Sequence, residues 1–267
     1  MFVVLLFIPF LPESPMFLHV QGRYEECEQV LERMIRWNQK KPMAGSVVTD
    51  SQNLQEISNK INPWQSVKIL YSRKYVVVTL LLMGIWFVNS FCYYGVVVMT
   101  PQFFKTGTSL SGYIESFITS AAELPGVIVA IFMINSAGRK KTQGFLFLFC
   151  GIFLFLLCIP TGTWLLTVFA VGARMCVMGA FSTTYVFTSE VFPTVVRSTG
   201  MGVCSSTSRI AGIITSFVAV GQVSIKPWVS LVVYAVLCIV GAAFTFAVPV
   251  ETNGKRFDNE DKQLSIK

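Results

Sequence analysis

Six long apolar runs dominate this 267-residue sequence and limit what it can fold into. A helix needs roughly 20 mostly apolar residues to cross the hydrocarbon core of a bilayer. Hydrophobic residues make up 53% of the chain and charged residues only 13%, which leaves too little polar surface for a water-soluble domain of this length. The sequence therefore predicts an all-α membrane protein that crosses the bilayer several times.

Short polar segments separate the expected membrane-spanning helices. The predicted spans cover residues 75–99, 112–136, 143–160, 163–188, 199–221 and 228–250. An apolar run at 1–11 precedes them; it lacks the basic leader of a signal peptide and is interpreted as the end of a truncated span. The expected organisation is that stub, a cytosolic loop at 12–74, a six-helix bundle at 75–250 and a cytosolic tail at 251–267.

The distribution of lysine and arginine predicts which loops face the cytosol. If the loop at 137–142 is cytosolic, alternation also places 12–74, 189–198 and the tail there, and these segments hold 17 of the 21 basic residues. The loops on the opposite side hold only Lys105 and Lys226. Basic residues concentrate in cytoplasmic loops of membrane proteins, so topology explains the net charge of +7. No basic stripe is present, and no nucleic-acid binding is expected.

The cytosolic loop contains a pattern typical of an amphipathic helix. Apolar residues recur at helical spacing from Tyr24 to Ile35, with Glu25 and Glu26 early and Arg36 late, so the charges complement the helix dipole. A weaker helical pattern follows at 54–61. We interpret the loop as a strut beneath the bundle.

Polar side chains inside a span cost free energy, so each is a candidate functional residue. In the first full span Trp86, Ser90 and Tyr94 share one helical face, with Asn89 and Tyr93 beside it. An aromatic and amide-lined stripe can stack on a planar or cationic ligand. Packing or anchoring at the membrane interface explains these residues equally well.

Glu123 is an acidic residue near the middle of the second span, just before Pro125 and Gly126. A kink there would free backbone carbonyl groups, and desolvation would favour the protonated acid. Glu123 is therefore a candidate for proton coupling. Helix-to-helix hydrogen bonding is the alternative.

Arg174 and Arg209 are the two cations within the spans. Arginine does not lose its proton, so each needs an acidic partner or an anionic ligand. Arg209 shares a face with Gly202 and Ser206, small residues that would let a ligand or a partner helix approach. An internal pair with a glutamate is the alternative for both, and it is the favoured one for Arg174.

Opposite charges gather at the predicted cytosolic ends of adjacent spans. The segment 189–200 joins two spans and carries Glu190 and Arg197, whose ion pair would have to break when the spans separate. Arg139 and Lys140 lie in the preceding cytosolic loop. These four residues are the predicted gate of a transporter.

Enzyme chemistry is not indicated. The seven cysteines lie mostly within spans without Cys-x-x-Cys spacing, so we expect small apolar packing groups and neither a zinc site nor a disulfide framework. The single histidine, His19, lies in a loop, and no nucleophile has a base nearby. We predict no enzymatic activity, no metal and no cofactor.

Several motifs resemble those of the major facilitator superfamily. Asn135–Lys141 resembles its Asp-x-x-Gly-Arg-Arg/Lys loop, although Asn135 stands where the family usually has aspartate. Glu190–Gly200 resembles its Glu-x-x-Pro-x-x-x-Arg-x-x-Gly motif, and Pro249–Lys255 its Pro-x-Glu-Thr-x-Gly-Lys ending. Pro12–Pro15 resembles the start of the central loop in the sugar and organic-ion branches.

Narrower motifs resemble the plant organic cation/carnitine transporters of the nicotinate-transporting type and the synaptic vesicle 2-related proteins. They are Tyr93-Tyr94-Gly95, Ala122-Glu123-Leu124-Pro125-Gly126, Arg174-Met175-Cys176 and Val218-Ala219-Val220-Gly221. The resemblance covers nearly the whole chain but only the second half of such a transporter. It implies a twelve-helix fold in which this chain is the C-terminal half and an N-terminal six-helix half is its partner.

The resemblance and the polar residues together predict a secondary active transporter of small organic ions, working by alternating access. Asn89, Tyr93, Tyr94, Glu123 and Arg209 would line the substrate site, and Arg139, Lys140, Glu190 and Arg197 would form the gate. A carboxylate or zwitterion such as nicotinate or carnitine is favoured, with protons as a candidate coupling ion. The alternatives are a non-transporting receptor or scaffold and an inactive fragment. The expected location is the plasma membrane or a vacuolar or vesicle membrane.

Overall fold

A computed structural model gives the arrangement of the chain. It describes residues 13–15, 18–19, 23–39, 63–103, 109–159, 162–223 and 227–250. The chain divides into two compact units, one of Met1–Ser66 with Phe257–Lys267 and one of Val67–Arg256. The predicted stub at 1–11, the weaker helical pattern at 54–61 and the tail at 251–267 lie outside the described residues.

The first unit contains helix α3 (Tyr24–Trp37). Glu25 and Glu26 lie in its first turn and Arg36 in its last turn, so the predicted amphipathic helix is confirmed. The guanidinium of Arg23 forms an ion pair with Glu26 and lowers the pKa of that carboxyl group, chiefly by hydrogen bonding.

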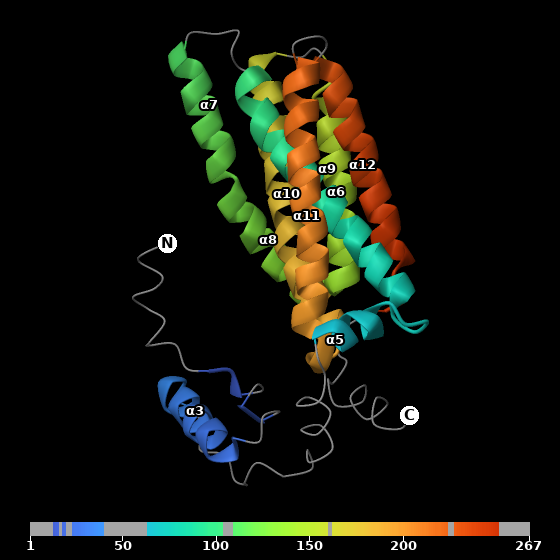
Figure 1. Cartoon of the computed structure of the whole chain (residues 1–267). Coiled ribbons are helices and arrows are strands. Elements are labelled where there is room, and N and C mark those ends of the chain that lie inside the picture. The colour runs from blue at the N-terminus through green and yellow to red at the C-terminus, as the bar shows by residue number, and fades with distance from the viewer. Residues whose placement is uncertain are drawn as a thin grey trace. The chain divides into compact units, whose positions relative to one another are not determined.

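The second unit is a bundle of helices that run up and down beside one another (Figure 1). The helices are α6 (Val76–Phe103), α7 (Ser109–Ala121), α8 (Glu123–Ala137), α9 (Arg139–Leu156), α10 (Thr163–Val191), α11 (Thr194–Val223) and α12 (Pro227–Ala247). A short helix, α5 (Pro63–Leu70), crosses the boundary between the two units. Only Ala122 separates α7 from α8, so this pair occupies the second predicted span.

Four helical stretches in the described part of the chain are long and apolar enough to cross a membrane: Val76–Thr100, Ser116–Ala137, Trp164–Val191 and Trp228–Ala247. The other two predicted spans correspond to α9 and α11, which are more polar. Helix α9 begins with Arg139, Lys140 and Lys141, and α11 contains Arg197 and Arg209. Both pack within the bundle, α9 against α10 and α12 and α11 mainly against α6.

The connections on the Arg139 side of the bundle are shorter than predicted. The expected loop at 137–142 reduces to Gly138, whose φ of 87° suits glycine. The expected hinge at 189–198 reduces to Phe192 and Pro193, where the proline forces the preceding residue into an extended conformation. The predicted loops were too long because charged residues at a helix end can reach water while the backbone stays helical.

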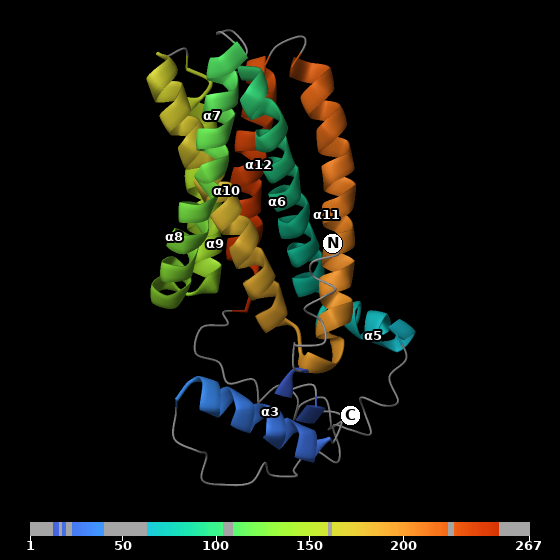
Figure 2. The same ribbon diagram turned by 90° about the vertical axis from the view of Figure 1, so that its left-hand side faces the viewer.

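Helix packing places α8 and α11 at opposite edges of the bundle (Figure 2). Helix α8 lies against α10 at Gly126, where an added Cβ atom would come within 2.5 Å of the Met175 carbonyl oxygen. Only glycine permits this approach. The core between the other helices is filled by large side chains that are almost fully buried, including Trp86, Phe147 and Tyr234.

Candidate functional site

A largely buried ion pair joins α8 and α10. Arg174 on α10 is only 6% exposed, and its Nη2 lies 2.5 Å from Oε1 of Glu123 in the first turn of α8. The Tyr93 hydroxyl on α6 is 3.5 Å from the other carboxylate oxygen, at the outer limit for a hydrogen bond. The favoured alternative for Arg174, an internal pair with a glutamate, is thus confirmed. The two charges balance each other, which is how a buried ion is tolerated.

A row of aromatic rings runs from this pair along the α6–α10 interface. Tyr94 contacts Tyr93, which contacts Phe181, with ring centroids 5.4 and 5.3 Å apart. Phe181 contacts Tyr185 at 5.5 Å, and Tyr185 contacts Trp86 at 4.6 Å. Trp86 belongs to the core, since it is 1% exposed and donates to the Thr188 hydroxyl. The tyrosines keep part of their ring surface exposed and can therefore stack on a planar ligand.

Asn89 does not lie on an open stripe beside these rings. It is 2% exposed, and its Nδ2 donates to the Thr184 hydroxyl on α10 at 3.1 Å. Gln143 on α9 donates to the same hydroxyl at 2.8 Å. The carbonyl oxygens of both amides are buried without a hydrogen-bond partner among the described residues. Gln143 and Thr184 were missed from the sequence, where Gln143 stands at the polar start of a span and Thr184 in an ordinary apolar run.

Arg209 has a different environment from Arg174. It is exposed on α11, at an edge of the bundle, and the described residues provide it with no ion-pair partner. One turn further along α11, a Cβ atom at Gly212 would lie 3.3 Å from the Tyr94 ring. Arg209 and Tyr94 therefore occupy neighbouring parts of the α6–α11 surface.

The four predicted gate residues lie at the start of α9, near the end of α10 and in the first turn of α11. Arg139 donates to Glu190 from Nε at 3.1 Å and from Nη2 at 2.9 Å, and both side chains are largely buried. Lys140 donates to the Val248 carbonyl oxygen at 2.7 Å. Glu190 thus pairs with Arg139 on α9, and the Arg197 Nε donates to the Phe192 carbonyl oxygen at 3.4 Å.

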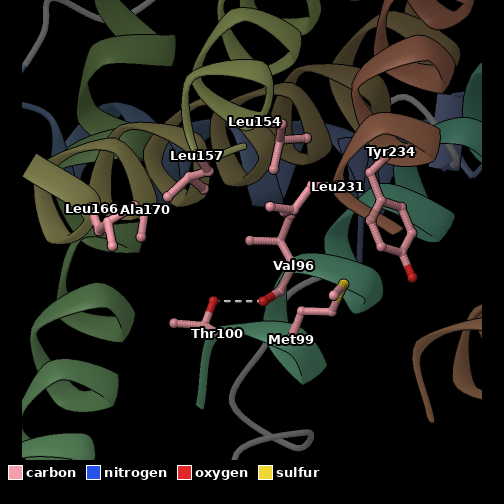
Figure 3. Close-up of a pocket in the computed structure, with 9 residues that line it drawn as sticks. All are labelled: Val96, Met99, Thr100, Leu154, Leu157, Leu166, Ala170, Leu231 and Tyr234. Carbon is pink, nitrogen blue, oxygen red and sulfur yellow. Dashed lines mark hydrogen bonds between the residues drawn. The ribbon is translucent and has the colours of Figure 1, made fainter. Parts of the chain in front are cut away.

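A small cavity opens among the ends of α6, α9, α10 and α12 that lie away from the gate residues (Figure 3). Its volume of about 30 Å³ has room for a few waters at most and not for an organic ion. Its lining is apolar, and the Thr100 hydroxyl already donates to the Val96 carbonyl oxygen. It contains none of the predicted site residues.

Known proteins resemble this chain along nearly its whole length. Residues 1–263 match the family model described as sugar (and other) transporter. The chain is 30% identical over 96% of its length to the synaptic vesicle 2-related protein of Xenopus laevis, of which it covers 48%. It is 30% identical over 95% of its length to organic cation/carnitine transporter 7 of Arabidopsis thaliana, of which it covers 59%. The chain therefore spans about half the length of the curated relatives it matches.

A solved structure shows the same architecture. The proton:xylose symporter XylE, a major facilitator superfamily protein bound to 6-bromo-6-deoxy-D-glucose, superimposes with a TM-score of 0.72 at 19% identity. The match covers 96% of this chain and 55% of that one. The fold is thus one half of a major facilitator fold, and the predicted resemblance and multi-pass membrane location are confirmed.

Proposed function

We propose that this chain, which belongs to the sugar (and other) transporter family of the major facilitator superfamily, forms one half of a secondary active transporter of small organic ions. An N-terminal six-helix half would complete it, and the two halves would expose a shared midplane site to each side of the membrane in turn. The observation that carries the proposal is Arg209, which is exposed in the middle of a bundle helix and has no ion-pair partner among the residues that the structure describes.

An arginine in this position cannot simply face lipid. Exposing its charge to the centre of a bilayer costs about 2.5–3.5 kcal/mol even on insertion-based scales. Glu123 already balances Arg174, so Arg209 leaves a positive charge on the α11 face. A carboxylate or a zwitterion, such as nicotinate or carnitine, would neutralise it better than a simple cation.

The proposed substrate site consists of Asn89, Tyr93, Tyr94, Glu123 and Arg209. Tyr93 and Tyr94 would stack on the ligand, and Arg209 would hold its negative charge. Asn89 would reach the ligand only when α6 and α10 move apart, because it is now buried between them.

The proposed gate is the Arg139–Glu190 pair with Lys140 and Arg197. The Arg139–Glu190 pair joins the start of α9 to the end of α10, and the Lys140 contact joins α9 to Val248 just after α12; both would break when this end of the bundle opens. Closing such a contact at one end is what alternating access requires.

Proton coupling through Glu123 is a second part of the proposal. Protonation would remove the carboxylate charge and release Arg174, whose Nε lacks an acceptor among the described residues. In proteoliposomes of the completed transporter, uptake should rise with an inward proton gradient, and Glu123→Gln should remove that dependence. Glu26→Gln, which changes a carboxylate on α3 outside the bundle, is the control. If uptake by the wild type does not depend on the proton gradient, proton coupling through Glu123 is wrong.

The two-half proposal is tested by expressing residues 1–267 alone and together with the N-terminal half of a close relative. Saturable carboxylate uptake is expected only for the combination. Saturable, selective uptake by the purified monomeric chain alone would contradict it.

A second candidate function is a non-transporting membrane receptor or scaffold. It is motivated by the similarity to a synaptic vesicle 2-related protein. Carboxylate binding to the completed protein without any uptake would support this function over transport.

A further inference from the structure

Three buried cysteines from different helices meet inside the bundle, apart from the proposed transport residues. They are Cys92 on α6, Cys150 on α9 and Cys238 on α12, and each is 0% exposed. The Cys238 sulfur lies 3.4 Å from that of Cys92 and 3.7 Å from that of Cys150. Cys204 on α11 is equally buried, but no sulfur contact is found for it among the described residues. The three buried thiols therefore form one cluster.

Hydrogen bonds orient the two outer thiols, those of Cys92 and Cys150, toward backbone carbonyl oxygens. The thiol of Cys238 lies between them. Cys92 donates to the Tyr234 carbonyl oxygen at 3.6 Å, and Cys150 donates to the Ala173 carbonyl oxygen at 3.7 Å. The single S–H of Cys238 can donate to either the Cys92 sulfur or the Cys150 sulfur, one at a time. The thiols are also held by close helix packing, because a Cβ atom at Gly151 would lie only 3.4 Å from the Cys238 Cβ atom.

We propose that Cys92 and Cys238 are a site of disulfide formation within the membrane bundle, with Cys150 as the competing partner of Cys238. A disulfide has a sulfur–sulfur length of about 2.05 Å, so small side-chain rotations must bring the two sulfurs together. The Cys92–Cys238 pair begins closer than the Cys150–Cys238 pair and is favoured for that reason.

The reaction requires a two-electron oxidant. A small neutral hydroperoxide fits because it can enter the hydrocarbon region. With hydrogen peroxide, two S–H bonds and the O–O bond break, one S–S bond forms, and two water molecules leave. The thiolate is the reactive form and apolar surroundings suppress it, so oxidation should be slower than for an exposed thiol.

A Cys92–Cys238 disulfide would fasten α6 to α12. Cys92 directly precedes Tyr93 and Tyr94, so the link would restrain the helix that carries these proposed binding residues. This consequence rests on the proposed function. Transport by the completed protein should fall on oxidation and recover on reduction.

The test treats the purified chain in detergent with hydrogen peroxide or diamide and maps its peptides without reduction. A linked Cys92–Cys238 peptide is expected, and it should disappear with reductant. Cys204→Ser should still form it, whereas Cys238→Ser should not. In Cys92→Ser, a Cys150–Cys238 link should replace it. Gel filtration of each variant checks that the bundle is folded.

Two outcomes would overturn the inference. If all three thiols of the oxidised wild type can still be alkylated after unfolding, the disulfide site is wrong. If Cys238 is found linked to neither Cys92 nor Cys150, the assignment is also wrong. Peptide mapping does not depend on transport, so a protein that cross-links but never transports contradicts only the proposed function. If the completed transporter is fully cross-linked and its uptake is unchanged, the claim that the disulfide restrains α6 is wrong.

Discussion

Arg174 and Arg209 are the same residue type on consecutive helices of the chain, yet their surroundings differ. Arg174 is buried between α8 and α10 and paired with Glu123. Arg209 is exposed at the α11 edge, and the described residues offer it no acidic partner. The charge of Arg174 is thus balanced within this chain, whereas the proposed ligand or partner half would have to balance that of Arg209. A charge with an internal partner serves the fold, and a charge without one points to a ligand or a partner half.

The largest expected effect is on uptake by the completed transporter. Arg209→Ala should reduce carboxylate uptake to background, because it removes the charge proposed to hold the ligand. The unfolding transition of the chain in detergent should be almost unchanged, since Arg209 makes no internal ion pair among the described residues. Arg209→Lys keeps the charge and should retain part of the uptake. Uptake at the wild-type level in the Arg209→Ala variant would contradict the proposed ligand-binding role that distinguishes Arg209 from Arg174.

Breaking the internal pair should instead destabilise the bundle. Arg174→Ala leaves Glu123 with an uncompensated, largely buried charge, and such changes cost about 3–5 kcal/mol. Chemical unfolding in detergent measures the loss. The double variant Glu123→Leu/Arg174→Met removes both charges and should recover most of it. If Arg174→Ala unfolds like the wild type, the pair does not hold α8 against α10.

Much of the bundle follows from the sequence because span length and apolarity are local properties. The six predicted spans correspond to α6, the α7–α8 pair and α9 to α12, and α3 was predicted from its charge pattern. Helix ends were predicted less well. The charged residues around Gly138 and Pro193 indicate loops by composition, but they lie on helix ends that reach beyond the apolar core.

The contacts of side chains between helices could not be predicted from the sequence, because they depend on how the helices pack. Glu123 and Arg174 are 51 residues apart, and only the packing of α8 on α10 brings them together. Asn89 and Tyr94 belong to the same polar stretch of one helix, yet Asn89 is buried against Thr184 and Tyr94 is partly exposed. Periodicity predicts a face but not which part of that face another helix covers.

A smaller effect should come from the close contact that positions Glu123. Gly126→Ala places a methyl group against the Met175 carbonyl oxygen and should cost about 1–3 kcal/mol in the free energy of unfolding. Gly202→Ala on α11 is the matched control, because no atom lies within 4 Å of its added Cβ. It should be neutral or stabilising by up to about 1 kcal/mol, the difference in helix propensity. Equal effects of the two changes would mean that α8 and α10 can separate without loss.

The smallest expected effect concerns the Arg139–Glu190 pair at the helix ends. Its arginine side chain is more exposed than that of Arg174, 23% against 7%, so water partly screens the pair, although Glu190 at 16% is slightly less exposed than Glu123 at 21%. Glu190→Gln should therefore lower the free energy of unfolding by only about 1 kcal/mol. The exchanged variant Arg139→Glu/Glu190→Arg keeps opposite charges facing each other and should recover part of this loss, but not all, because Arg139 has further interactions. A double-mutant cycle in detergent gives the coupling energy of the pair. A contact that must open in each transport cycle is expected to be weak, so a coupling as large as that of Glu123 and Arg174 would argue against its role as a gate.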